Sequence, residues 1–253
     1  MPTGEVALVT GAAKRIGRVI AERLARDGYA VAIHYGHSGD AAEAVVASIQ
    51  AAGGHAAMLQ ADLADAEAVD GLIRAAQAAL GPLTLLVNNA SEFEPDAIET
   101  LDIDRWERHF AVNLRAPAFL ARDFAAQLPA ERHGCIVNVI DQRVLKPNPQ
   151  FFSYTLTKSA LFTATRTLAQ SFAPRIRVNA VGPGPTLASS RQDPEAFARQ
   201  SDAVPLGHGA TPEEIAEAVL FLARARSVTG QMIAVDGGQH LAWETPDAVG
   251  VTE

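Results

Sequence analysis

Short apolar runs alternate with longer segments of helical periodicity along almost the whole chain. The apolar runs cover residues 5–10, 29–35, a stretch ending near 60, 83–87, 135–140, 175–181 and 231–236. The helical segments cover residues 15–27, 41–52, 65–80, 100–128, 152–172, a short patch at 194–201 and 211–223. Because no break in composition divides the series, the sequence predicts one α/β domain over residues 1–253. We expect a doubly wound, seven-stranded parallel sheet with helices on both faces.

Two segments depart from this regular alternation. Residues 100–128 form one long helical region, which we expect to bend near Asn113 or Pro117. Residues 183–210 are long for a connection, and loops of more than about 12–15 residues are usually functional or disordered. We therefore expect a substrate-covering loop there, and an irregular tail after Gly238.

The composition argues against several classes of function. With 21 basic and 29 acidic residues, a net charge of −8, the chain lacks the basic stripe that a nucleic-acid backbone requires. No apolar run approaches the length of a membrane span, and residues 1–5 lack the features of a signal peptide. The single Cys135 allows no internal disulfide, and no Cys/His cluster has metal-ligand spacing. We therefore expect a cytoplasmic protein without nucleic-acid, membrane or metal partners.

A glycine-rich turn at residues 10–17 lies between the first predicted strand and the first predicted helix. This is the position of a dinucleotide-binding turn. Gly11 would permit the tight turn, Gly17 would let the helix pack closely on the sheet, and the first helical amides would bind a pyrophosphate. An ordinary glycine-rich turn is the alternative.

The end of the second predicted strand bears on the choice between NADH and NADPH. An acidic residue there would bind the ribose 2′-hydroxyl and repel a 2′-phosphate, but no carboxylate occurs before Asp40. Lys14 and Arg15 add two cations, so the sequence favours NADPH. Alternatives remain open: Lys14 and Arg15 could be solvated, His37 could be a surface residue, and Asp62 could cap a helix instead of binding the adenine.

Asn88 and Asn89 follow the apolar run of the fourth predicted strand. Their amide side chains could line the cofactor or tie neighbouring strands together. Both interpretations are open from the sequence.

Tyr154 and Lys158 lie one helical turn apart, so both side chains project from the same face of a helix. The apolar run before them would deliver Asp141 at the end of a buried strand. Tyr154 could donate a proton if the Lys158 ammonium lowers its pKa. Asp141 could accept N–H groups of a substrate or relay a proton, and a strand-end cap or a site that has lost catalysis are the alternatives.

The order and spacing of these motifs resemble the short-chain dehydrogenase/reductase superfamily over essentially the whole chain. The matching segments are residues 10–17, 88–90, Asn113, Tyr154 with Lys158, and 181–184. The resemblance implies a single Rossmann domain and a homo-oligomer, for which we expect a homotetramer. It also implies that Asn113, Tyr154 and Lys158 occupy catalytic positions, with Asn113 holding a proton-relaying water.

Two departures from the superfamily pattern resemble its pteridine reductase branch. Arg15 replaces the usual middle glycine of the turn, and Asp141 replaces the usual catalytic serine. In that branch the arginine lies near the phosphates and the pterin, and an aromatic residue matching Phe93 sandwiches the pterin against the nicotinamide. Substrate-binding residues are then expected at Arg15, Ser91, Phe93, Asp141, Tyr154 and Gly184. Cofactor-binding residues are expected at Gly11, Lys14, Arg15, Ile16, Gly17, Tyr35, His37, Ser38, Asp62, Leu63, Asn89, Ala90, Tyr154, Lys158, Gly184 and Thr186.

The sequence therefore predicts an NADPH-dependent reductase of pteridines such as dihydrobiopterin, dihydromonapterin or dihydrofolate. A carbonyl or 3-oxoacyl reductase is the enzymatic alternative, and a non-catalytic NADP(H)-binding redox sensor is the alternative of another class. Phe93 could equally be a core residue. Leu187, Phe197 and Leu206 are candidates for an apolar lid, and Trp243 could reach a neighbouring subunit.

Overall fold

A computed structural model describes residues 4–188 and 193–243. Within them, seven parallel strands form one sheet in the order β3-β2-β1-β4-β5-β6-β7. The strands are β1 Val6–Val9, β2 Ala30–Tyr35, β3 Ala56–Gln60, β4 Leu85–Asn88, β5 Gly134–Val139, β6 Ile176–Pro183 and β7 Met232–Val235. The predicted fold class is confirmed.

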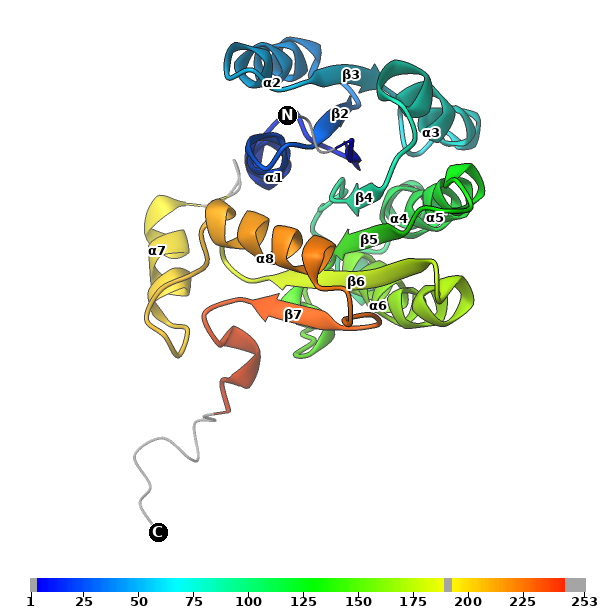
Figure 1. The fold of residues 1–253 in the computed structure, drawn as a ribbon. Coiled ribbons are helices and arrows are strands. Elements are labelled where there is room, and N and C mark those ends of the chain that lie inside the picture. Colours follow the sequence, from blue (N-terminus) through cyan, green and yellow to red (C-terminus); the bar gives the residue numbers. More distant parts are fainter. Residues whose placement is uncertain (1–3, 189–192, 244–253) are drawn as a thin grey trace.

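Helices cover both faces of the sheet (Figure 1). One face carries α1 Arg15–Arg26, α2 Gly39–Ala51 and α8 Pro212–Arg224. The other carries α3 Ala66–Leu80, α4 Ile103–Phe110, α5 Ala116–Gln127 and α6 Phe152–Phe172. A separate helix, α7 Pro194–Asp202, lies beyond the end of β6. Because helices cover both faces of the sheet, the central strands β1, β4 and β5 are buried along their whole lengths.

Local sequence signals account for several helix boundaries. The Asp65 side chain caps α3, and Thr211 and Glu214 form a capping box at the start of α8. The expected bend near Asn113 is a π-helical segment, Ala111–Arg115, between α4 and α5. The tail after Gly238 is not wholly irregular, because a 3-10 turn spans Gln239–Leu241.

The order in which the chain adds strands to the sheet reverses at β1, which pairs with β2 on one side and β4 on the other. Open parallel sheets bind ligands at such a point, beyond the carboxyl ends of the strands. None of the helices in the described part of the chain is long and apolar enough to cross a membrane.

Candidate active site

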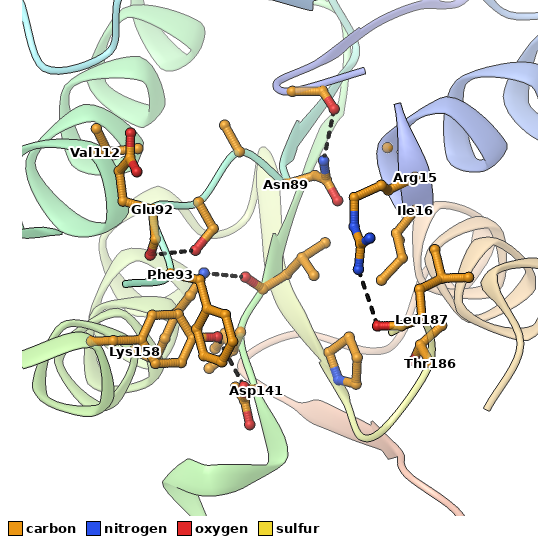
Figure 2. Close-up of a pocket in the computed structure, with 18 of the residues that line it drawn as sticks. Arg15, Ile16, Asn89, Glu92, Phe93, Val112, Asp141, Lys158, Thr186 and Leu187 are labelled. Carbon is orange, nitrogen blue, oxygen red and sulfur yellow. Dashed lines mark hydrogen bonds between the residues drawn. The ribbon is translucent and has the colours of Figure 1, made fainter. Parts of the chain in front are cut away.

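A cleft of about 1000 Å³ opens at this edge of the sheet. Of the residues predicted for the site, all line the cleft except Asn113 and Tyr35. Figure 2 shows Arg15, Ile16, Thr186 and Leu187 on one side of the cleft and Glu92, Phe93 and Lys158 on the other. The described residues hold no group of three or more His, Cys, Asp or Glu side chains arranged to bind a metal.

The glycine-rich turn leaves no space for side chains at its two glycines. Gly11 has a φ of +64°, and a Cβ on Gly17 would lie 2.2 Å from the Gly11 carbonyl oxygen. Lys14 forms the N-cap of α1 without a side-chain cap, and the first turn carries no acidic residue. Close backbone contact and an uncapped helix start are the features that a bound pyrophosphate requires.

Arg15 adopts a left-handed backbone conformation, with a φ of +54°, at the position where the superfamily usually has glycine. Such strain in a residue other than glycine persists where the surroundings enforce it, often at functional sites. The guanidinium donates hydrogen bonds to the carbonyl oxygens of Leu187 (3.1 Å, Figure 2) and Ala188 (2.9 Å). Arg15 therefore ties the turn to the first part of the expected covering loop.

His34, on β2, contacts the glycine-rich turn in a way that the sequence did not reveal. The Gly11 N–H donates to Nδ1 at 3.0 Å, so the neutral ring carries its proton on Nε2, which lies 3.1 Å from the Ala61 carbonyl oxygen. Burial lowers the pKa of His34 to about 4. The neutral imidazole thus links β2, the glycine-rich turn and the end of β3.

The residues beyond β2 and β3 form the far end of the cleft. Lys14, His37 and Ser38 line it, whereas Tyr35 packs beside Gly39 at the start of α2.

Asp62 also lines this end of the cleft. Its Oδ1 accepts a hydrogen bond from the Ala64 N–H at 2.9 Å, and this bond lowers the pKa of Asp62. Arg108, which the sequence did not single out, lies 3.5 Å from Oδ2 and pairs with Glu92 at 2.7 Å. Asp62 therefore has protein partners that an adenine amino group would join or displace.

The two asparagines after β4 have different contacts. Asn88 donates to Asn138 on β5 at 2.9 Å and so ties two strands together. Asn89 donates to the Thr10 carbonyl oxygen at 2.9 Å and lines the cleft beside the glycine-rich turn. The strand-tying interpretation therefore holds for Asn88, whereas contact of Asn89 with a cofactor stays a prediction.

Asp141, Tyr154 and Lys158 meet where β5 ends beside α6. The Tyr154 hydroxyl donates to Asp141 Oδ2 at 2.9 Å, and Lys158 Nζ donates to the Val139 carbonyl oxygen at 3.0 Å. Nζ lies 5.7 Å from the centroid of the Tyr154 ring. Tyr154 is 5% exposed and Lys158 is 2% exposed, so both polar groups act in a largely water-excluded environment.

Burial dominates the ionisation of this cluster. It raises the pKa of Asp141, raises the pKa of Tyr154 well above 10 with a further contribution from the Asp141 charge, and lowers the pKa of Lys158 to about 8. The condition that a nearby cation lowers the pKa of Tyr154 is not met in this cleft, because burial and the adjacent carboxyl group outweigh the Arg143 guanidinium. The phenol therefore stays protonated and donates its hydrogen to Asp141.

Asn113 lies in the π-helical segment and is fully buried. Its amide donates to the Glu92 carbonyl oxygen and to Thr157 Oγ1, and its Oδ1 accepts from the Glu92 N–H and from Ser91 Oγ. All hydrogen-bonding positions of the side chain are therefore occupied by protein groups. The side chain holds residues 91–92 in place, and a role for Asn113 in holding water stays a prediction.

Phe93 is partly exposed and lines the cleft. Its ring stacks on Phe151, with centroids 4.2 Å apart and planes 4° apart, and meets the edge of Tyr154 at 4.7 Å. The Arg143 guanidinium lies 4.8 Å from the Phe151 centroid and 3.9 Å from an Asp141 oxygen. Phe151 and Arg143 were not predicted, and the left-handed φ of +56° at Phe151 leaves no signal in the sequence.

The covering segment begins with a close backbone contact. A Cβ on Gly184 would lie 2.6 Å from Asp236 Cβ, and Thr186 Oγ1 donates to the Gly184 carbonyl oxygen at 3.1 Å. Of the candidate lid residues, Leu187 and Phe197 line the cleft, whereas Leu206 is exposed outside it. Residues 189–192 of the expected loop lie outside the described residues.

Comparison with known proteins agrees with this geometry. A family model described as enoyl-(acyl carrier protein) reductase matches residues 11–240. The 3-oxoacyl-[acyl-carrier-protein] reductase FabG of Staphylococcus aureus is 35% identical over 241 residues, which cover 93% of this chain and 98% of FabG. An uncharacterised oxidoreductase of Methylorubrum extorquens is 40% identical over 245 residues, covering 93% of this chain and 97% of that protein.

Among solved structures, FolM alternative dihydrofolate reductase 1 from Brucella canis, complexed with NADP, superimposes with a TM-score of 0.94. It is 54% identical in sequence, and the match covers 98% of each chain. The likeness therefore extends over the whole cleft and both of its ends.

Proposed function

Because the chain belongs to the short-chain dehydrogenase/reductase superfamily, we propose that it is an NADPH-dependent reductase of dihydropteridines. The observation that carries this proposal is the hydrogen bond from the Tyr154 hydroxyl to Asp141. A serine at position 141 would donate a hydrogen bond to a carbonyl substrate, whereas a carboxylate can only accept. An acceptor beside the proton donor suits a substrate that presents N–H groups next to the atom being reduced.

NADPH fits the residues of the cleft. The close backbone packing at Gly11 and Gly17 and the uncapped start of α1 suit a pyrophosphate, and no carboxylate ends β2 to repel a 2′-phosphate. The Brucella canis relative was crystallised with NADP, which supports the same cofactor here. When bound, NADPH supplies a hydride to the substrate carbon.

The residues of the chain supply the proton that the reduction requires. Reduction of a C=N bond places a hydride on carbon and a proton on nitrogen, so that one C–H and one N–H bond form. Tyr154 donates that proton, and the Asp141 carboxyl group beside it holds the hydroxyl in position until a proton from solvent restores the phenol. Lys158 is anchored to Val139 and directs its charge toward the reacting atoms and a cofactor ribose.

The remaining predicted contacts form part of the same proposal. Phe93 provides a flat apolar surface for the pteridine ring, with Arg15 and Ser91 at its edges. Leu187 and Phe197 belong to a loop that covers the substrate, and Arg15 holds that loop through its two hydrogen bonds. The homotetramer and the cytoplasmic location also stay predictions, to be checked by light scattering and by cell fractionation.

A carbonyl or 3-oxoacyl reductase is the second candidate, because FabG of Staphylococcus aureus is 35% identical over nearly its whole length. The Asp141 carboxyl group argues against it, since the expected hydroxyl donor is absent from that position. The two candidates therefore differ in what a serine at position 141 should do.

The deciding experiment measures NADPH consumption with dihydrobiopterin, dihydrofolate and an acetoacetyl thioester, in the wild type and in Asp141→Ser and Asp141→Asn. We expect turnover of a dihydropteridine by the wild type and a loss of about 10²-fold or more in both variants. Turnover of the thioester that serine preserves or improves would instead identify a carbonyl reductase. NADPH binding without turnover of any of the three substrates would contradict the proposal.

A further inference from the structure

Three buried polar side chains form a hydrogen-bonded network next to the site without lining the cleft. Asp96 lies in the segment after β4, His109 belongs to α4, and Ser153 is the second residue of α6. Their exposed fractions are 7%, 1% and 0%. The His109 ring lies 6.4 Å from the Tyr154 ring, so the network is close to the proton donor without touching the reacting atoms.

The contacts define the position of each proton in the network. The Glu94 N–H donates to His109 Nε2 at 3.2 Å, so this nitrogen carries a lone pair. The neutral ring therefore carries its proton on Nδ1, which lies 2.6 Å from Ser153 Oγ. Ser153 Oγ then donates its own hydrogen to the Asp96 carboxylate. Burial lowers the pKa of His109, which favours this neutral form.

The network joins the two residues that neighbour the substrate-facing rings. Glu94 directly follows Phe93, and Ser153 directly precedes Tyr154. The Phe93 and Tyr154 rings meet edge to face, with centroids 4.7 Å apart. The network therefore connects the backbone of one ring to the backbone of the other through His109.

Asp96 also substitutes for the missing cap of α6. Phe151 occupies the N-cap position with a left-handed backbone and offers no polar side chain. The Asp96 carboxylate accepts the Ser153 N–H at 3.2 Å instead, and its carbonyl oxygen accepts the Phe152 N–H at 3.3 Å. The start of the helix that carries Tyr154 is thereby fixed to the segment that carries Phe93.

We propose that Asp96, Ser153 and His109 are positioning residues that set the spacing between Phe93 and the Tyr154 hydroxyl. This inference rests on the proposed function, because the spacing aligns a planar substrate on Phe93 with the proton donor. The Glu94 end of the network fixes the substrate-binding ring. The Ser153 end fixes the start of the catalytic helix.

Two substitutions of His109 separate the two ends. In His109→Asn the amide nitrogen can replace Nδ1 and donate to Ser153, but the bond from the Glu94 N–H to Nε2 is lost. In His109→Gln the amide oxygen can replace Nε2 and accept from Glu94, but the donor to Ser153 is lost. We expect His109→Asn to raise KM for the substrate about tenfold with little change in kcat, and His109→Gln to lower kcat about tenfold with a smaller change in KM.

Thr84→Val is the matched control for stability. Thr84 is buried outside the cleft, and its hydroxyl makes two hydrogen bonds with the Val6 backbone. We expect this variant to unfold at a lower temperature with unchanged kcat and KM. If both His109 variants also unfold at a lower temperature with unchanged kcat and KM, as expected for Thr84→Val, the network has a structural role only and the proposal is overturned.

A second measurement needs no turnover. Nitrogen NMR of the NADPH-bound wild type at pH 7, with the His109 signals identified by their loss in His109→Asn, should report the proton on Nδ1. A proton on Nε2 would overturn the hydrogen-bond order on which the proposal depends. The kinetics use whichever substrate the wild type reduces. If the pteridine assignment is wrong, the wild type will not reduce a dihydropteridine. If the positioning role is wrong, the His109 variants will keep the kcat and KM of the wild type.

Discussion

At the glycine-rich end of the cleft the backbone forms the site, whereas at the Asp141 end side chains from distant segments form it. The first end depends on the φ of Gly11, the absence of a Cβ at Gly17 and the open start of α1. The second depends on a carboxyl, a phenol and an ammonium group whose pKa values burial shifts. Substitutions at the first end should therefore affect folding and cofactor affinity together, while those at the second should affect turnover with the fold intact.

The largest expected effect lies at the Asp141 end. Tyr154→Phe removes the hydroxyl that donates to Asp141 and keeps the ring that contacts Phe93. We expect kcat to fall about 10³-fold, because proton transfer by a positioned group contributes on the order of 10²–10⁴-fold. NADPH affinity, measured by nucleotide fluorescence, should stay within about twofold of the wild type. A comparable loss of NADPH affinity would show that the two ends are not separable.

At the glycine-rich end, Gly17→Ala tests whether the backbone contact carries the site. Its Cβ would lie 2.2 Å from the Gly11 oxygen and 2.4 Å from Asn89 Nδ2. We expect a loss of about 3 kcal/mol in the free energy of unfolding, together with a loss of NADPH affinity. Gly71→Ala, within α3 and with no atom within 4 Å of its Cβ, is the control and should instead stabilise the protein by about 0.5–1 kcal/mol. Equal effects of the two substitutions would refute the contact argument.

His34 makes the glycine-rich end sensitive to acid. Its folded pKa of about 4 is below the unfolded value of about 6.5, so the unfolded chain binds the proton more readily. The stabilisation is complete above pH 6.5 and is lost as the pH falls through 4, with a slope of up to about 1.4 kcal/mol per pH unit. Denaturant unfolding of the wild type should show this slope relative to His34→Asn, which does not titrate. If the free energy of unfolding changes with pH in parallel for the two proteins, His34 does not contribute to this acid sensitivity.

Sequence reasoning succeeded where the signal was local. The alternation of apolar runs and helices predicted the sheet, and the capping pair Thr211 and Glu214 marked the start of α8. The spacing of Tyr154 and Lys158 predicted that both lie on one face of a helix, and the structure brings Asp141 to them.

Contacts between distant segments could not be predicted in this way. His109 and Ser153 are 44 residues apart, and neither has a pattern that distinguishes it from an ordinary buried residue. The sequence shows a cation near Tyr154 but not the extent of burial, which raises the pKa of the phenol.

The two hydrogen bonds from Arg15 to the carbonyl oxygens of residues 187 and 188 bear on the timing of the catalytic cycle. On the proposed function, in which this segment covers the cleft, we expect spent nucleotide to leave past it, so that the lifetime of these bonds would limit how often the cleft reopens. Both acceptors are uncharged, so the opening rate should depend little on ionic strength, in contrast to the encounter with a polyanionic nucleotide.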